Sequence, residues 1–359
     1  MIRTAHRLSI RTAAPALLPL ILFILLALHA EAAAAVTANR LRLCLETMIP
    51  SLFGCMAAAN LLTGTGAAAW LGARLSWLAR LLHLPPELLT VFLVSQIAGY
   101  PVGTVLLRQM VRAGRLDAKS AARYACICFG GGPAFAVGFA GSRMFGRAAI
   151  GWMMLGGCIL ANVILLLLLP KPEVPESAAP QVHLSAEALP DAVSAAMRSL
   201  AAICGMVLLF GLLMLLCDLL GITGLLVRLG GVCGLSEQRV RALMLAVSDV
   251  TQLQGLLRCG LPCRLLISLT GALLSFGGIC VHLQCRALSA GFIRMRNLLT
   301  ARLSAAALTF LILYVLSAFF DTDEAAAVLA YPAAVSRSGS PLPAILIFCT
   351  GFPFLIKKD

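Results

Sequence analysis

Long runs of uncharged, apolar residues recur along this whole 359-residue chain. A helix needs about 20 consecutive apolar residues to cross the hydrocarbon core of a bilayer. Nine runs approach or exceed that length: 13–30, 47–73, 88–107, 124–142, 148–170, 199–217, 265–285, 303–320 and 338–356. Helices satisfy their own backbone hydrogen bonds inside a bilayer. The pattern therefore predicts an all-α polytopic membrane protein whose main partner is the lipid bilayer.

Charge and cysteine content narrow the function. Only 12% of the residues are charged, against about 25% in soluble domains. The net charge of +13 is typical of arginines retained in cytoplasmic loops, so we expect no nucleic-acid partner. Most of the 13 cysteines lie in apolar runs, and the close pairs Cys126/Cys128 and Cys259/Cys263 have no second pair at zinc spacing. We expect no metal site, no cofactor and, without any enzyme motif, no enzymatic activity.

The N-terminus allows two interpretations. Arg3, Arg7 and Arg11 precede an apolar run that ends in HAEAAAAV, which is similar to a signal peptide with its cleavage site. The favoured alternative is an uncleaved first span, because the first helix of a multi-span protein can direct insertion. That interpretation predicts a cell-membrane protein with a cytoplasmic N-terminus.

A proline-rich, acidic linker divides the chain. Residues 170–191 contain five prolines and four acids, which exclude a span there. The predicted organisation is an N-terminal cytoplasmic segment with the first transmembrane helix (1–38), a first repeat (39–170), the linker (171–191), a second repeat (192–320) and a C-terminal segment with a last transmembrane helix (321–359). The sequence leaves the oligomeric state open, a homo-oligomer included.

Two motifs recur in the same order in both halves. FGG occurs at 129–131 and again at 276–278, and the first copy continues into a glycine and Pro133, which interrupt a helix. Upstream of each lies a second interrupted stretch, AGYPVG at 98–103 and SDVTQ at 248–252. Each half thus has the order span, interrupted segment, broken span, span. This recurrence predicts an internal repeat.

Loop charges predict how the interrupted segments lie. Seven basic residues flank 98–103, namely Arg74, Arg80, Arg108, Arg112, Arg115, Lys119 and Arg123. All seven stay on the cytoplasmic side only if the segment enters the membrane and returns. The same reasoning places Arg286, Arg294, Arg296, Arg302, Lys357 and Lys358 inside. We therefore predict re-entrant hairpins at 88–111 and 236–258, about eight transmembrane helices, and two inverted repeats.

The broken segments predict a binding cavity. Non-helical backbone at membrane depth persists where protein or a watery cavity satisfies its polar groups. The predicted lining consists of Gly99, Tyr100, Pro101, Gly103, Gly130, Gly131, Gly132, Pro133, Asp249, Thr251, Gln252, Ser275, Gly277, Gly278, His282 and Gln284. The alternative is that the glycines only let helices pack closely.

Asp249 and His282 are the most informative of these residues. An acid within an apolar run can bind a cation, carry a proton or accept hydrogen bonds from a solute. The alternative for Asp249 is an ion pair with Arg239 or Arg241 near the membrane surface. His282 lies about one helical turn after Gly278 and either faces the same cavity or makes a structural hydrogen bond.

These motifs resemble those of a known family. AGYPVGT at 98–104, GGPAF at 131–135, DVT at 249–251 and SFGGICVHLQ at 275–284 are similar to the sporulation integral membrane protein YlbJ family. They are similar more broadly to nucleoside-recognition (Gate) domain proteins. The resemblance implies a multi-pass transporter-like protein that moves a small polar solute, nucleoside-like or ionic, in connection with sporulation. Two alternatives stay open: a non-transporting scaffold for spore formation, and a ferrous-iron permease-like component using Cys280, His282 and Cys285.

Overall fold

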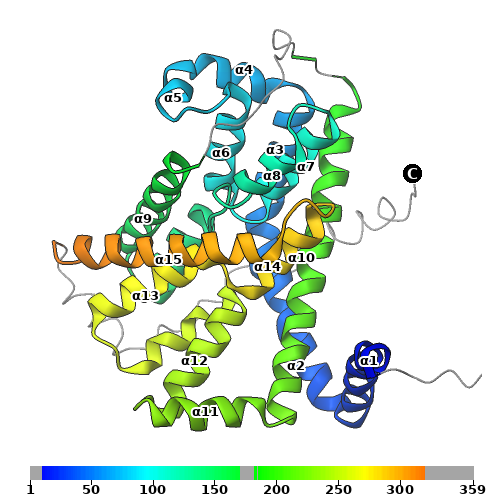
Figure 1. Cartoon of the computed structure of the whole chain (residues 1–359), viewed down its shortest axis with the longest axis vertical. Coiled ribbons are helices and arrows are strands. Elements are labelled where there is room, and N and C mark those ends of the chain that lie inside the picture. Colours follow the sequence, from blue (N-terminus) through cyan, green and yellow to red (C-terminus); the bar gives the residue numbers. More distant parts are fainter. Residues whose placement is uncertain (1–9, 170–181, 184, 320–359) are drawn as a thin grey trace, which may run out of the picture.

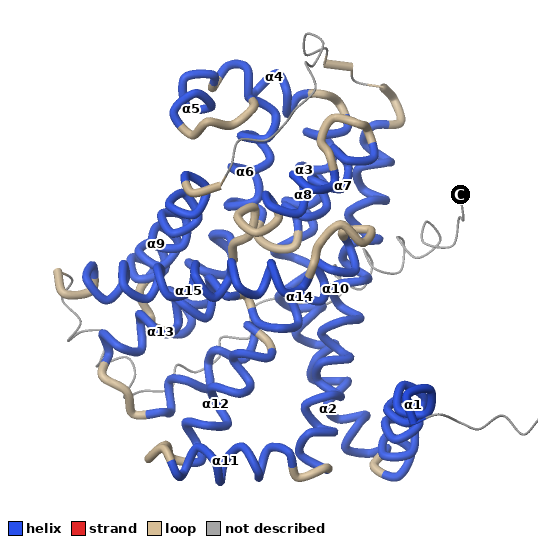
Figure 2. The backbone as a smooth tube through the Cα atoms, viewed as in Figure 1, coloured by secondary structure: helices blue, strands red, loops and turns tan. Residues whose placement is uncertain are grey.

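Helices make up every regular element of the described chain. The computed structural model describes residues 10–169, 182–183 and 185–319, with backbone alone at 10–16 and 18, and Figure 2 shows no strand in this part. Five of its helices are long and apolar enough to cross a membrane: Ala30–Gly64, Ala148–Leu167, Ala188–Leu219, Cys263–Leu288 and Met295–Leu316. The prediction of an all-α multi-pass membrane protein is confirmed at this level. The predicted last span at 338–356 lies outside the described residues.

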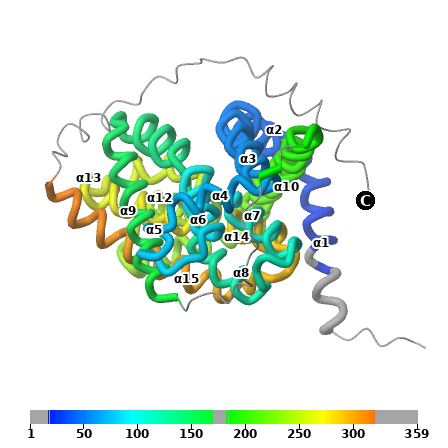
Figure 3. The backbone as a smooth tube through the Cα atoms, turned by 90° about the horizontal axis from the view of Figure 1, so that it is seen from above, coloured from blue at the N-terminus to red at the C-terminus, as the bar shows by residue number. Residues whose placement is uncertain are grey.

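The described chain begins with a separate helix, α1 (Ile10–Leu28), and a long continuous helix that follows it. α1 lies apart from the other helices in Figures 1 and 3. α2 (Ala30–Leu43), the wide turn η1 (Cys44–Met48) and α3 (Ile49–Gly64) then form one continuous helix. No glycine or proline occurs between Ala30 and Pro50, so no helix-breaking residue interrupts the helix there. The predicted boundary between residues 38 and 39 therefore falls inside this helix.

The first predicted hairpin is present as two helices. α4 (Ala67–Arg74) and α5 (Ser76–Leu81) lead into α6 (Pro86–Ala98), and α7 (Val102–Arg112) returns. The turn at residues 99–101 uses Gly99 at a φ of 79°, which favours glycine. An ion pair between Arg115 and Glu87 joins the two outer ends. The segment therefore enters the molecule and comes back to the same end.

The second half repeats this arrangement of elements. α10 (Ala188–Leu219) is followed by α11 (Ile222–Val232), α12 (Glu237–Ser248) and η3 (Val250–Cys259). The Arg239 Nε–H donates to the Cys259 carbonyl at 3.0 Å, which joins the outer ends of this hairpin. The linker prediction extends too far, because residues 188–191 already belong to α10. Pro190 is tolerated there because the first turn of a helix needs no N–H partner.

Each half then contains a broken segment and a closing helix. In the first, α8 (Ala118–Tyr124), the non-helical residues 125–131 and η2 (Ala134–Met144) precede α9 (Ala148–Leu167). In the second, α13 (Cys263–Phe276) meets α14 (Gly278–Leu288) at two glycines of positive φ, before α15 (Met295–Leu316). The apolar run at 124–142 therefore does not form one continuous helix.

The two hairpins enter from opposite ends of the molecule. In Figure 1, α4–α6 occupy the top and α11–α12 the bottom, with the broken segments between them. α3 packs against α10 and runs in the opposite direction, and α9 packs against α15. One cluster of buried side chains connects both hairpins and both broken segments. This core brings the tips of the hairpins together at mid-height.

Candidate functional site: a cavity between the hairpin tips

A small cavity of about 40 Å³ lies where the hairpin tips meet the broken segments. Tyr100 lines it from the first tip, Asp249 and Thr251 from the second, and Gln284 from α14. α3 and α10 complete the wall with Ser51, Ile203 and Val207, among others. One water occupies about 10–15 Å³ by this measure. The cavity in this conformation therefore holds a few waters or a small ion, and a nucleoside does not fit.

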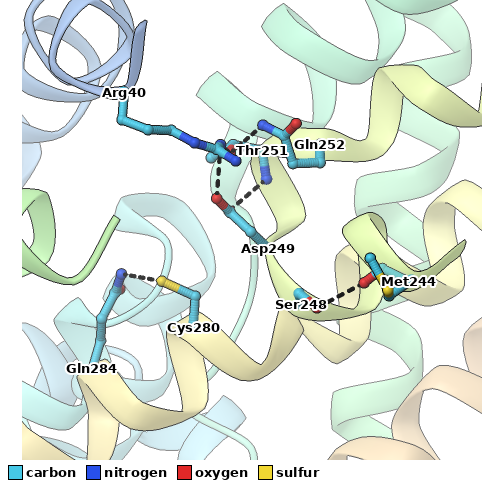
Figure 4. A network of polar contacts seen from close by, with 8 residues as sticks. All are labelled: Arg40, Met244, Ser248, Asp249, Thr251, Gln252, Cys280 and Gln284. Atoms are coloured by element: carbon cyan, nitrogen blue, oxygen red, sulfur yellow. Dashed lines mark hydrogen bonds and ion pairs between the residues drawn. The ribbon is translucent and has the colours of Figure 1, made fainter. Parts of the chain in front are cut away.

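Asp249 is the charged centre of the site (Figure 4). It ends α12 in an extended conformation, and its Oδ1 accepts the Thr251 backbone N–H at 3.0 Å. Its Oδ2 lies 3.2 Å from Nη1 of Arg40, which reaches across from α2 and also contacts the Thr251 hydroxyl at 3.4 Å. Asp249 is only 2% exposed. The site thus contains a nearly buried carboxylate held by one guanidinium nitrogen.

The alternative prediction, an ion pair of Asp249 with Arg239 or Arg241, is wrong. Arg239 donates to the Cys259 carbonyl, and Arg241 pairs with Glu237 and Asp218. Both arginines lie two to three helical turns before Asp249, at the outer end of the hairpin. An ion pair over 209 positions of sequence supplies the counter-charge instead.

Two amides flank this ion pair. The Gln284 side chain donates to the Cys280 sulfur at 3.4 Å and lines the cavity. Gln252 donates to the Thr251 hydroxyl at 3.4 Å, is half-buried and lies outside the lining residues. Gln284 is therefore the amide available to a bound solute.

Tyr100 offers an unused hydrogen-bond donor. Its ring packs against Phe129 with centroids 5.0 Å apart. Its hydroxyl is buried and has no hydrogen-bond partner in the described part of the chain. Buried polar atoms nearly always have a partner, so this hydroxyl is the atom of the site that most clearly lacks a ligand.

The predicted glycines make close contacts rather than lining the cavity. A Cβ on Gly132 would lie 2.8 Å from the Ile97 carbonyl, and one on Gly278 would lie 3.0 Å from the Val250 nitrogen. Gly103 approaches the Cys128 carbonyl still more closely. The same holds for Gly99 against Gly131 and for Gly277 against Phe129. Gly99, Gly103, Gly130, Gly131, Gly132, Gly277 and Gly278, with Pro101 and Pro133, are absent from the lining. Each hairpin tip thus packs on the broken segment of its own half, as the close-packing alternative expected.

Side-chain amides satisfy the carbonyls of the first broken segment. The Gln96 amide donates to the Ile127 carbonyl at 3.1 Å, and Asn162 donates to the Phe129 carbonyl at 2.8 Å. The backbone N–H of Tyr100 donates to Gly130 at 2.6 Å. Asn162 also donates to the Gln96 side-chain oxygen at 2.9 Å, so the two amides form one network. Polar groups from α6 and α9 therefore replace the helical hydrogen bonds that the break removes.

Arg302 joins the two broken segments. Its five N–H groups reach the Cys126 carbonyl, the Asn162 side-chain oxygen, and the carbonyl and hydroxyl of Ser275, at 2.7–3.2 Å. The guanidinium also stacks over the Phe129 ring at 4.6 Å. It is fully buried and has no ion pair in the described chain. Ser275, predicted to line the cavity, instead serves this arginine.

The sequence prediction for Arg302 is wrong. The sequence predicts a cytoplasmic location for Arg302 because the apolar run begins one residue later, but α15 starts at Met295 and carries Arg302 into the core. The sequence prediction of the site does not include Gln96 and Asn162. Each is a polar residue inside an apolar run, where polar groups need a partner, and that pattern is the signal that could identify them.

His282 makes a structural hydrogen bond and does not face the cavity. Its Nδ1 lies 2.7 Å from the Gly278 carbonyl, and its ring lies between Phe276 and Phe129, at centroid distances of 4.7 and 5.6 Å. It does not line the cavity, and its Nε2 is buried without a partner among the described atoms. Cys280 and His282, both named in the ferrous-iron alternative, lie about 200° apart around the helix, so their side chains do not share one face. Within the described residues no three His, Cys, Asp or Glu side chains are placed to hold a metal.

Comparisons with known proteins give no relative: no family model, no curated protein and no solved structure matches the chain. The fold and the site define its class alone. The described part of the chain is an all-helical, multi-pass membrane protein in which two helical hairpins meet two broken helices at a small cavity that contains Asp249.

Proposed function

We propose that this protein moves a small polar solute or ion across the cell membrane through the cavity at Asp249. The observation that carries the proposal is the meeting of two hairpin tips and two broken segments at a nearly buried carboxylate. Broken helices at membrane depth are a recurrent way to build solute sites in transporters. The small cavity favours an ion or a compact solute over a nucleoside in this conformation.

The proposal includes an inverted repeat, with about eight transmembrane helices and two re-entrant hairpins. It is supported by the shared order of elements in the two halves and by hairpins that enter from opposite ends (Figure 1). Contacts between the corresponding helices α3 and α10, and between α9 and α15, are those expected beside a pseudo-two-fold axis. The basic residues around the first hairpin fit a cytoplasmic location for that end of the molecule.

The Arg40–Asp249 ion pair serves as the gate of the proposed site. A cation, or a solute with hydrogen-bond donors, competes with Arg40 for the Asp249 carboxylate. The Tyr100 hydroxyl and the Gln284 amide then supply the remaining contacts. Arg40 holds the carboxylate through one nitrogen at 3.2 Å, which is less than the bidentate contact this pair can form. Its displacement therefore costs less than breaking a two-point contact.

Flux through proteoliposomes tests this proposal. The purified protein is reconstituted and supplied with a panel of monovalent and divalent cations, small organic acids and nucleosides. We expect one class to cross, and Asp249→Asn to lower its flux at least tenfold. The matched control is Asp218→Asn, which removes an exposed acid paired with Arg241 and should leave flux unchanged. Unchanged flux in Asp249→Asn would remove the role given to this residue.

A scaffold in spore formation is the second candidate, and one observation favours it. The glycines at both breaks are used in close packing, so the breaks have a structural use without transport. A folded, reconstituted protein that moves none of the panel would support this candidate. The link of either candidate to sporulation rests on the resemblance to the YlbJ and Gate families, and a sporulation defect after deletion of the gene is its test.

A further inference from the structure

Arg108 is an incompletely satisfied arginine near the outer end of the first hairpin. It lies on α7, one turn before Arg112, and is half-buried. Its Nη1 makes one long contact, 3.5 Å to the Leu288 carbonyl at the end of α14. Its Nε is buried and has no hydrogen-bond partner among the described atoms. A buried donor without an acceptor costs about 1–3 kcal/mol. Binding of an acceptor from outside the described chain to this nitrogen would therefore be favourable.

The charges around Arg108 are also positive. The side chains whose charge acts on it most strongly are Arg112 on the same helix and Arg198 on α10. Both are exposed, and neither has a hydrogen bond or ion pair in the described part of the chain. α14 packs against both α7 and α10, and the charges of Arg112 and Arg198 lie near enough to act on Arg108. No acid in the described part of the chain pairs with any of the three arginines. Like charges in such a group repel one another unless an anion lies between them.

We propose that Arg108, Arg112 and Arg198 form a binding site for a phosphate group, supplied by an anionic phospholipid. A phosphate oxygen accepts the unused N–H of Arg108 and offsets the repulsion among the three side chains. Basic pockets between membrane helices are well suited to lipid headgroups, which lie at the level of helix ends. Because α7 is the return leg of the first hairpin, the lipid also fixes the outer end of the element whose tip carries Tyr100. The site is separate from the cavity and does not depend on the proposed function.

The test measures thermal unfolding in a neutral detergent with three additives: phosphatidylglycerol micelles, phosphatidylcholine micelles and inorganic phosphate. The variant is Arg112→Gln/Arg198→Gln, since both side chains are exposed and neither makes a hydrogen bond or ion pair in the described part of the chain. The matched control is Arg228→Gln/Arg258→Gln, which removes two exposed arginines from the other hairpin end with the same change in net charge. An equal unfolding temperature of all three proteins without additive confirms that they are folded.

We expect phosphatidylglycerol to raise the unfolding temperature of the wild type and the control in a saturable way, and phosphatidylcholine to do so much less. The variant should need about tenfold more phosphatidylglycerol for half of the effect, as the loss of two basic contacts near a lipid surface implies. A saturable effect of inorganic phosphate that the variant loses would assign the same site to a free anion. Equal responses of the variant and the control, or no saturable response at all, would overturn the proposal.

Discussion

The two broken segments solve the same problem with different amounts of help. The first leaves helical geometry over residues 125–131, and its carbonyls accept hydrogen bonds from Gln96, Asn162 and Arg302. The second breaks at two glycines only, and its Ser275 carbonyl is taken up by Arg302 alone. The number of polar side chains recruited thus follows the number of backbone groups that the break sets free.

The carbonyls of the first break are satisfied by side chains from other helices of the chain. The donors come from α6, α9 and α15, while the second break is satisfied largely within α13 and α14 apart from Arg302. The first break should therefore be the more sensitive of the two to substitutions elsewhere in the chain. Arg302 is the one residue on which both depend.

The largest effect is expected for Arg302→Met. The substitution leaves the Cys126 and Ser275 carbonyls, the Ser275 hydroxyl and the Asn162 oxygen without donors in the core. The loss should be on the order of 4 kcal/mol in unfolding free energy, from several unsatisfied acceptors at about 1–3 kcal/mol each. Thermal unfolding and the yield of monodisperse protein measure it.

Arg302→Lys and Arg296→Met sharpen that result. Lysine keeps the charge but offers three donors from one point, so it should recover only part of the stability. Arg296 lies exposed on the same helix, and its replacement should change little. Equal stability of Arg302→Met and Arg296→Met would show that the two breaks do not depend on a common residue.

The next effect tests whether each break packs on its own hairpin tip. Gly132→Ala and Gly278→Ala each place a Cβ 3.0 Å or less from backbone at a φ of 65° or 75°. Each should cost about 2–4 kcal/mol of unfolding free energy, from overpacking together with left-handed backbone strain. Gly138→Ala is the control in η2, because nothing lies within 4 Å of its added Cβ. A large loss in one break and none in the other would contradict the matched packing.

A smaller effect is expected at Asp117, which caps α8 before the first break. Its carboxylate accepts the backbone N–H groups of Lys119 and Ser120, and hydrogen bonds led by the Ser120 side chain hold the pKa of Asp117 below its usual value. Asp117→Ala should cost about 1 kcal/mol at pH 7. The helix that leads into the first break thus begins with a side-chain cap, whereas α13, which leads into the second break, has none.

The pH dependence of the same variant fixes the sign of that effect. Because the folded-state pKa of Asp117 is lowered, its stabilisation is complete above the unfolded-state pKa of about 4 and declines as the pH falls through the folded-state value. The difference between wild type and Asp117→Ala in unfolding temperature should therefore be constant from pH 8 to 6 and shrink below about pH 4. A difference that grows on acidification would exclude the cap as its cause.

The smallest effect on stability is expected for a substitution at the first hairpin tip. This substitution tests whether the first tip contacts the solute as the second tip does. Tyr100→Phe removes a buried hydroxyl with no described partner, so the unfolding free energy should change by less than about 0.5 kcal/mol. If the hydroxyl donates to the transported solute, flux should fall roughly threefold to tenfold, as expected for one hydrogen bond. Normal flux in a folded Tyr100→Phe protein would remove Tyr100 from the proposed solute contacts and leave those of the second tip.

The sequence alone determined the class of the protein and the positions of its interruptions. Long uncharged runs require helices, because a bilayer offers no partner for exposed backbone groups. The motifs at 98–103, 129–133, 248–252 and 276–278 marked both hairpin tips and both breaks, because glycine and proline act on the backbone at their own position. These features are local, and they depend on few neighbours.

The tertiary structure alone decided which side chains serve them. The partner of Asp249 is Arg40, 209 positions away, rather than the nearby Arg239 or Arg241. Arg302 adjoins an apolar run, so the sequence predicts a charged loop residue. In the structure α15 begins at Met295, and Arg302 lies in the core. Whether a glycine lines a cavity or packs against backbone depends on helices that the local sequence does not contain. Hydrogen bonds and ion pairs act over a few ångströms in space, and the fold alone sets which residues lie within that reach.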